Sequence, residues 1–193
     1  MNKNYDIAAY VWPAYTSESS TTRIFWEKGI GEWQTVLASE ARFEGQVWPR
    51  RPLWGCVNEA NPDVMEMQIK SAINHGVNVF IYDWYWYDNR PFLENCLNDG
   101  FLKAKNQDKM KFFIMWANHD ANTLWDRRTS QQETTIWEGK VTPEQFYTIG
   151  SAGLSSTLRW IATIRSTESL WSASTMWQTS STDWAASSRQ RTH

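Results

Sequence analysis

Three short apolar segments of the chain have the length and composition of buried β-strands. Residues 5–12 form an apolar run that ends at Pro13, and residues 77–82 are rich in β-branched and aromatic side chains. Residues 111–116 repeat that character. Short length and flanking turn residues favour strands over helices. We therefore predict three buried strands.

Helix signals separate these strands. Asn61 followed by Pro62 is typical of a helix start, and apolar residues recur at helical spacing from there to Gly76, a residue typical of a helix end. Residues 92–105 predict a second helix, and residues 142–143 (Thr-Pro) repeat the starting signal. The residues expected to face inward from the second helix are Leu93, Cys96 and Leu97.

The alternation of strands and helices predicts an α/β fold with parallel strands, built from about three βα units. The 193 residues are enough for one domain but short for a complete (β/α)8 barrel of about 250 residues. Residues 14–61 are mostly irregular, and so long a loop is usually functional.

Polar and aromatic residues follow each predicted strand. In parallel α/β folds chemistry gathers at this end of the strands. Aromatic rings stack on the apolar faces of sugars, while carboxylate, amide and imidazole groups bind the hydroxyls. Core packing is the alternative role for any single tryptophan. The expected sugar-binding residues are Tyr10, Trp12, Glu32, Trp33, Asp83, Tyr85, Trp86, Trp116, Asn118 and His119.

Charge and motif content exclude several classes of function. The net charge of -2 predicts no nucleic-acid partner. No apolar run is long enough to span a membrane, and the lack of an apolar leader predicts a cytoplasmic location. Cys56 and Cys96 predict two reduced thiols, and no metal or cofactor motif is present. We expect neither a metal nor a cofactor.

An ordered series of motifs resembles the glycoside hydrolase family 99-like group, which includes WbsX-type polysaccharide enzymes. Residues 26–33 match a W-x-x-G-x-x-E-W segment, residues 46–54 are rich in Arg and Pro, and the series continues through residues 76–86, 93–94 and 115–118. The resemblance covers about residues 5–147. It implies a (β/α)8 barrel that acts on glycosidic bonds of a mannose-like or surface polysaccharide.

Two departures from the family pattern affect the expected chemistry. Much of the family has glutamate where this chain has His119, so no glutamate role is carried over to that position. The family's acid/base carboxylates lie in a late N-E-W-x-E-G segment that this sequence lacks. Glycoside cleavage needs two positioned carboxyl groups. We interpret Glu32 and Asp83 as binding groups, assign no catalytic residue, and expect the chain alone to be inactive.

Composition changes abruptly after Gly150. Of the 43 residues from Ser151 to His193, 18 are Ser or Thr and four are Trp, with no helix or strand period. Linkers are normally poor in tryptophan. A shifted reading frame from Trp160 permits a Y-Y-x-I-D-G-K-P turn and a strand ending in I-Y-D, similar to the family's next βα unit.

We therefore expect residues 1–150 to be a partial barrel and residues 151–193 a frameshifted tail without a native fold. A genuine linker is the alternative for the tail. For the whole chain, the leading hypothesis is a fragment of a carbohydrate-active enzyme with an oligosaccharide or polysaccharide partner. A non-catalytic carbohydrate-binding protein and an interaction fragment with no sugar role are the alternatives.

Overall fold

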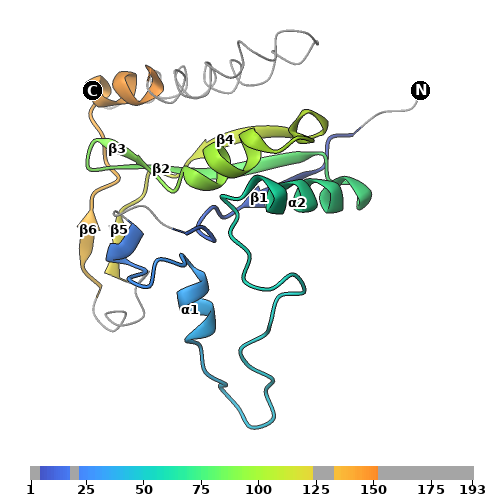
Figure 1. The fold of residues 1–193 in the computed structure, drawn as a ribbon. Coiled ribbons are helices and arrows are strands. Elements are labelled where there is room, and N and C mark those ends of the chain that lie inside the picture. The colour runs from blue at the N-terminus through green and yellow to red at the C-terminus, as the bar shows by residue number, and fades with distance from the viewer. Residues whose placement is uncertain (1–4, 18–21, 124–132, 152–193) are drawn as a thin grey trace. The chain divides into compact units, whose positions relative to one another are not determined.

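The structure, a computed structural model, describes residues 5–17, 22–123 and 133–151. A parallel sheet lies within the unit formed by residues 1–140 (Figure 1). Strand β2 (Val79–Tyr87) lies between β1 (Ala8–Val11) and β4 (Lys111–Trp116), and it is parallel to both. All three strands lie where the sequence predicts them. The mixed α/β class with parallel strands is confirmed.

Helix α2 (Pro62–Asn74) packs against one face of this sheet and begins as its sequence predicts. The Asn61 side chain accepts a hydrogen bond of 2.9 Å from the backbone N–H of Asp63, which satisfies a donor at the helix start. Met65 and Ile69 are fully buried, and the Tyr82 hydroxyl lies 3.7 Å from the Met65 sulfur. Burial of each apolar side chain contributes about 1.5 to 3 kcal/mol to stability.

The connection from β2 to β4 differs from the predicted helix of residues 92–105. Phe92 belongs to strand β3 (Arg90–Phe92), and helical structure follows as the π-helix η2 (Cys96–Gly100) and the 3-10 helices η3 (Phe101–Lys103) and η4 (Gln107–Lys109). The prediction was wrong at its start because β3 pairs with the end of β2. The three side chains expected to face inward, Leu93, Cys96 and Leu97, are nevertheless buried.

Strand β2 is longer than the sequence predicted, and it continues past Asp83 as far as Tyr87. Residues 79–84 pair with β4, whereas residues 85–87 pair antiparallel with β3. Asp88 and Asn89, which join β2 to β3, both have positive φ angles of 50° and 55°. That conformation suits a two-residue hairpin turn, and Asp and Asn adopt it more readily than most residues.

Alternation along β2 gives the sheet two different faces. Phe80, Tyr82 and Trp84 face the helices, as the ring contacts of Phe80 and Tyr82 with Phe101 of η3 show. Val79, Ile81, Asp83, Tyr85 and Tyr87 therefore face the other way. We call these the helix face and the open face of the sheet.

The open face is covered near the carboxyl ends of the strands by segments from the loops. These include η1 (Thr22–Ile24) with the residues after it, and the ribbon of β5 (Ala121–Asn122) and β6 (Thr135–Trp137). They enclose a hydrophobic cluster built mainly from Ala14, Phe25, Trp26, Tyr85, Tyr87, Phe92, Leu93 and Ala121.

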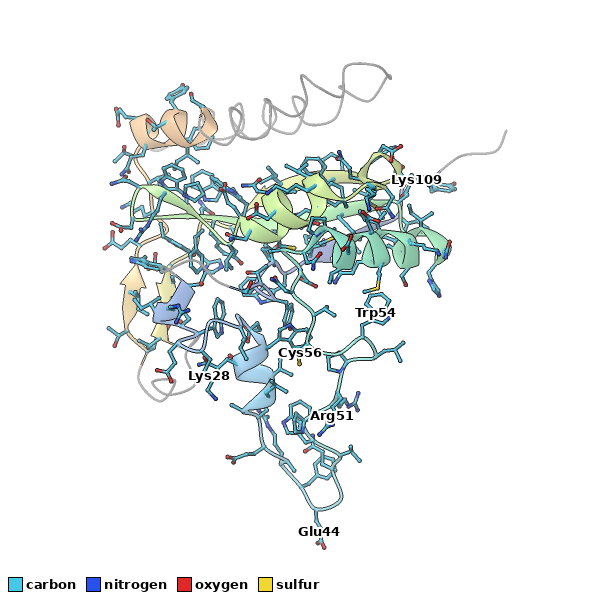
Figure 2. All side chains as sticks on the ribbon, in the orientation of Figure 1. Lys28, Glu44, Arg51, Trp54, Cys56 and Lys109 are labelled. Atoms are coloured by element: carbon cyan, nitrogen blue, oxygen red, sulfur yellow. The ribbon has the colours of Figure 1, made fainter. Side chains whose placement is uncertain are left out.

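A long loop joins the short helix α1 (Trp33–Leu37) to α2. In Figure 2 it extends to Glu44 and returns through Arg51 and Trp54. Two hydrogen bonds hold its returning end near residue 15 and α1: Trp33 Nε1 donates to the Val57 carbonyl at 2.8 Å, and the Glu59 N–H donates to the Tyr15 carbonyl at 2.9 Å.

Residues 141–193 form a second unit, separate from residues 1–140. Its described part is a helix over residues 143–151, as predicted. The Thr142 hydroxyl accepts from the Gln145 N–H, and the Gln145 side chain accepts from the Thr142 N–H, at 3.2 and 2.8 Å. This reciprocal pair is a capping box. The expectation of a frameshifted tail falls on residues 152–193, which lie outside the described residues.

Within the described part of the chain, no helix is long and apolar enough to cross a membrane.

Candidate functional site at the strand ends

Five of the residues predicted from the sequence meet near the carboxyl ends of β1, β2 and β4. The Trp12 and Tyr85 rings lie edge to face with centroids 5.8 Å apart, and the Tyr85 and His119 rings do the same at 5.6 Å. Glu32 hydrogen-bonds Trp12 through its side chain, and Asp83 interacts electrostatically with His119. We call Trp12, Glu32, Asp83, Tyr85 and His119 the strand-end cluster.

A glycine brings Glu32 to this cluster from the loop. Gly31 has a φ of 58°, and a Cβ there would collide with the carbonyl oxygens of Ala14 and Thr16. Only glycine therefore permits this close approach. The Glu32 N–H then donates to the Ala14 carbonyl at 2.9 Å, which places its side chain beside Trp12.

Both carboxyl groups of the cluster have raised pKa values. Burial raises the pKa of Glu32, although hydrogen bonds from Thr35 and Trp12 oppose the rise. Burial also raises the pKa of Asp83, against the attraction of His119. The Asp83 Oδ1 atom is buried without a hydrogen-bond partner among the described residues. Such an atom is costly unless a further group binds it.

Tyr85 belongs to the cluster, but its ring is closed off from solvent. Its exposed fraction is 2%. Its ring stacks on that of Tyr87 at 5.8 Å, and the Tyr87 ring stacks in turn on Trp137 at 5.7 Å. Tyr85 therefore lies behind Trp12 and His119 in the hydrophobic cluster.

Two predicted site residues lie on the opposite side of the sheet. Trp116 is in register with Trp84 of β2, and side chains in register on parallel strands share a face. Trp86 also lies beside Trp84, with ring centroids 5.9 Å apart. Trp84 donates to Glu94 Oε1 at 3.0 Å on the helix face. Trp86 and Trp116 thus lie on the helix face, apart from Tyr85 on the open face, and their part in one sugar-binding mouth stays a prediction.

The remaining predicted residues are nearby but are not brought into the cluster by a contact. Tyr10 lies on the open face and is 71% exposed. Asn118 is exposed and directly precedes His119. Trp33 instead lines a separate pocket formed with residues of the long loop.

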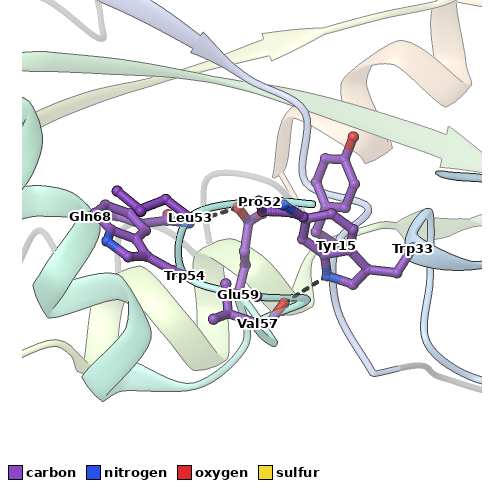
Figure 3. Close-up of a pocket in the computed structure, with 9 residues that line it drawn as sticks. Tyr15, Trp33, Pro52, Leu53, Trp54, Val57, Glu59 and Gln68 are labelled. Carbon is purple, nitrogen blue, oxygen red and sulfur yellow. Dashed lines mark hydrogen bonds between the residues drawn. The ribbon is translucent and has the colours of Figure 1, made fainter. Parts of the chain in front are cut away.

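This second feature, which we call the loop pocket, has a volume of about 400 Å³ (Figure 3). The Tyr15 and Trp33 rings form one wall with centroids 4.4 Å apart. Gln68 Nε2 donates to Glu59 Oε1 at 2.7 Å on the other side. The lining residues are Tyr15, Trp33, Pro52, Leu53, Trp54, Gly55, Val57, Glu59 and Gln68.

Sequence reasoning did not single out Tyr15, Trp54, Glu59 or Gln68 as a group. They come from three separate segments that share no motif, and only the folded loop brings them together. The length of the irregular loop was the one feature of the sequence that pointed to a functional role for this region.

Among the described residues, no group of three or more His, Cys, Asp or Glu side chains is placed to hold a metal ion. The two cysteines are free thiols, with Cys56 exposed and Cys96 buried.

Comparison with known proteins places these features in a family. The family model described as Glycosyltransferase WbsX matches residues 7–146, a range that contains the strand-end cluster and the loop pocket. The chain belongs to the WbsX glycosyltransferase family. This agrees with the WbsX-type resemblance seen in the motifs.

Two relatives of this WbsX-family chain are proteins described as uncharacterized protein WxcX. They come from Xanthomonas campestris pv. campestris strains B100 and ATCC 33913, and each is 31% identical over 105 residues. The match covers 54% of this chain but 15% of each relative. The chain thus matches a small part of much longer proteins. No solved structure matches it.

Proposed function

We propose that this chain is the N-terminal part of a (β/α)8-barrel enzyme that transfers or hydrolyses glycosidic bonds of a polysaccharide. The observation that carries the proposal is the buried Oδ1 of Asp83, which has no hydrogen-bond partner among the described residues and lies within electrostatic range of His119 in the cluster that also holds Trp12. A hydrogen-bond acceptor next to aromatic faces suits a sugar, because pyranose rings combine hydroxyl donors with apolar C–H faces.

Strand order supports the barrel part of the proposal. The parallel strands lie in the sheet in the order in which they occur along the chain, β1, β2 and β4. Helix α2 lies in the first connection, and the hairpin strand β3 with η2 and η3 lies in the second. Sequential parallel strands with helices on one face are the repeating unit of a (β/α)8 barrel. In that arrangement the open face becomes the barrel interior, and the strand-end cluster lies at its catalytic end.

Each cluster residue has a proposed role. Trp12 offers a ring face to the sugar, Asp83 accepts hydrogen bonds from sugar hydroxyls, and His119 contacts a hydroxyl on the side facing away from Tyr85. Glu32 orients Trp12 through their hydrogen bond. Tyr85, being buried, is a positioning residue that holds the Trp12 and His119 rings.

Catalysis is not assigned to these residues. An acid and a base or nucleophile must flank the scissile bond, and the family's late carboxylate segment is absent from this sequence. We propose that the chain binds carbohydrate without turnover. We also propose that residues from 151 onward come from a shifted reading frame, on the composition and codon argument alone.

The test is titration of the full chain with neutral oligosaccharides, mannotriose among them, followed by calorimetry. Asp83→Asn should weaken binding about tenfold or more, because a hydrogen bond to a charged group contributes about 1.5 to 3 kcal/mol. Asp88→Asn is the matched control, since Asp88 is exposed on the hairpin and pairs with Arg90. Equal binding by both variants would refute the proposed site.

A further inference from the structure

The loop pocket has firm walls on the side of the sheet and α1. Trp33 is fixed by its hydrogen bond to the Val57 carbonyl, and Tyr15 packs against the Trp33 ring. The backbone of Glu59 is held to Tyr15. A volume of about 400 Å³ falls within the range of about 300 to 1,000 Å³ that small-molecule sites occupy. The pocket is therefore large enough for a small ligand, and contacts within the protein hold its Tyr15–Trp33 side in place.

The pocket combines aromatic faces with open hydrogen-bonding groups. Trp54 contributes an indole that is 44% exposed. Gln68 donates to Glu59, but its carbonyl oxygen accepts no hydrogen bond from any described residue, and the Tyr15 hydroxyl and the Trp54 N–H have no such partner there either. A pyranose ring has the matching chemistry, with C–H faces for the rings and hydroxyls for the polar groups.

Charge restricts the kind of sugar. Glu59 is the only carboxyl group among the lining residues, and none of them is Lys, Arg or His. Glu59 is held by Gln68 on one oxygen and lies 3.8 Å from the Cys96 sulfur on the other. A carboxylate or phosphate on the ligand would have no cation to pair with there and would be repelled by Glu59 when it is ionised.

Tyr15 connects this pocket to the strand-end cluster. Glu32 of the cluster and Glu59 of the pocket both raise the pKa of its phenol by their charge, after burial, which is the larger cause. The backbone hydrogen bonds from Glu32 to the Ala14 carbonyl and from Glu59 to the Tyr15 carbonyl place both residues next to this tyrosine, so the pocket and the cluster are neighbours.

We propose that the loop pocket is a second carbohydrate subsite, which takes a neutral pyranose unit while an adjoining unit occupies the strand-end cluster. The proposal rests on the proposed function in that the ligand class is carbohydrate, but it concerns different residues. Trp54 stacks on the ring, and Glu59 with Gln68 binds its hydroxyls.

The experiment uses the full chain with methyl α-mannopyranoside and methyl α-glucopyranoside as neutral probes and a methyl glucuronide as the anionic one. Binding is followed by saturation-transfer NMR and calorimetry. Trp54→Ala should weaken binding of a neutral probe roughly three- to tenfold. Phe43→Ala is the matched control, because Phe43 is an exposed aromatic of the same loop that does not line the pocket.

Glu59→Gln tests the role of charge through the preference for neutral probes over the glucuronide, which a merely structural role of Glu59 would not change. It keeps the size of the side chain but removes the charge that repels the glucuronide, so discrimination against the glucuronide should fall roughly threefold or more. Thermal melts of each variant check folding, and Trp54 is exposed enough for its truncation to leave the core intact.

The outcomes separate the two proposals. Mannotriose binding that Asp83→Asn weakens and Trp54→Ala leaves unchanged would overturn the loop subsite while supporting the strand-end site. Loss of neutral-probe binding in Trp54→Ala with normal binding in Phe43→Ala supports the subsite, whatever Asp83→Asn does. Failure of the unmodified chain to bind either neutral probe, or preference for the glucuronide, would overturn it.

Discussion

The Tyr87 hydroxyl donates a hydrogen bond of 2.7 Å to the backbone carbonyl of His119. This contact joins the end of β2 to the segment that follows β4. It also fixes the peptide that carries the His119 ring, so the position of a proposed sugar-binding residue depends on a buried phenol two residues beyond Tyr85.

Removal of this donor should therefore loosen the strand-end cluster. Tyr87 is 2% exposed, and Tyr87→Phe leaves the His119 carbonyl with one hydrogen-bond donor fewer in a partly buried setting. We expect a loss of about 1 to 3 kcal/mol in the free energy of unfolding, measured by urea denaturation. Tyr5→Phe, at a residue that is 75% exposed, should change stability by less than about 0.5 kcal/mol. Equal effects of the two substitutions would contradict this account.

Glu59 should make stability depend on pH. Its pKa is raised, chiefly by burial and against hydrogen bonds from Gln68 and Cys96, so the folded state holds its proton more tightly than the unfolded chain. Stability is then greatest below the ordinary glutamate pKa and falls as pH rises toward the raised one. The free energy of unfolding of Glu59→Gln minus that of the unmodified chain should therefore be more positive at pH 7 than at pH 4, as measured by urea titration. A difference independent of pH would show that Glu59 does not titrate in this range.

Asp6, at the other end of the sheet, should give stability the opposite dependence on pH. Hydrogen bonds from Lys111 and Asn78 lower its pKa, so its contribution to stability is present above the ordinary aspartate pKa. That contribution is lost as pH falls through the lowered value. Lys111→Met should raise the pKa of Asp6 toward its usual range, as seen in an NMR titration of its carboxyl carbon. An unchanged titration would rule out Lys111 as the main cause.

The shifted-frame proposal makes a prediction at the level of the gene. Resequencing the DNA over codons 145 to 155 should find an insertion or deletion that returns the downstream reading to the frame that starts on the third base of each present codon. Translation of that frame should then give the Y-Y-x-I-D-G-K-P turn. An uninterrupted frame, together with a tryptic peptide from residues 166–189 in the purified protein, would favour a genuine linker.

Elements governed by local signals were predictable from the sequence. The cap at Asn61 and the apolar run of β4 depend on neighbouring residues, so both lie where the pattern puts them. The start of the second predicted helix was not predictable in this way. Phe92 pairs with Tyr85 across a hairpin whose two positive-φ residues, Asp88 and Asn89, carry only a weak turn signal.

The candidate site was predictable as a region but not as a set of contacts. Residues after parallel strands gather at one sheet edge, and this brought Trp12, Asp83 and His119 together. The face on which a strand-end residue lies depends on where the strand stops. The unforeseen continuation of β2 to Tyr87 put Trp86 on the helix face. The loop pocket was missed because Tyr15 and Glu59 lie 44 positions apart and meet through a backbone hydrogen bond.

The anchoring of the long loop at its two ends allows the loop pocket to change independently of the sheet. Residues 39–56 run between one attachment at α1 and another at Val57 and Glu59, and they supply Trp54 to the pocket while taking no part in the sheet. Insertions and substitutions in such a surface segment cost little stability. Exchange of this segment for another would therefore alter the proposed loop subsite, while the strands and the strand-end cluster stay as they are. Grafting the corresponding loop of a relative onto this scaffold is the same experiment in the laboratory.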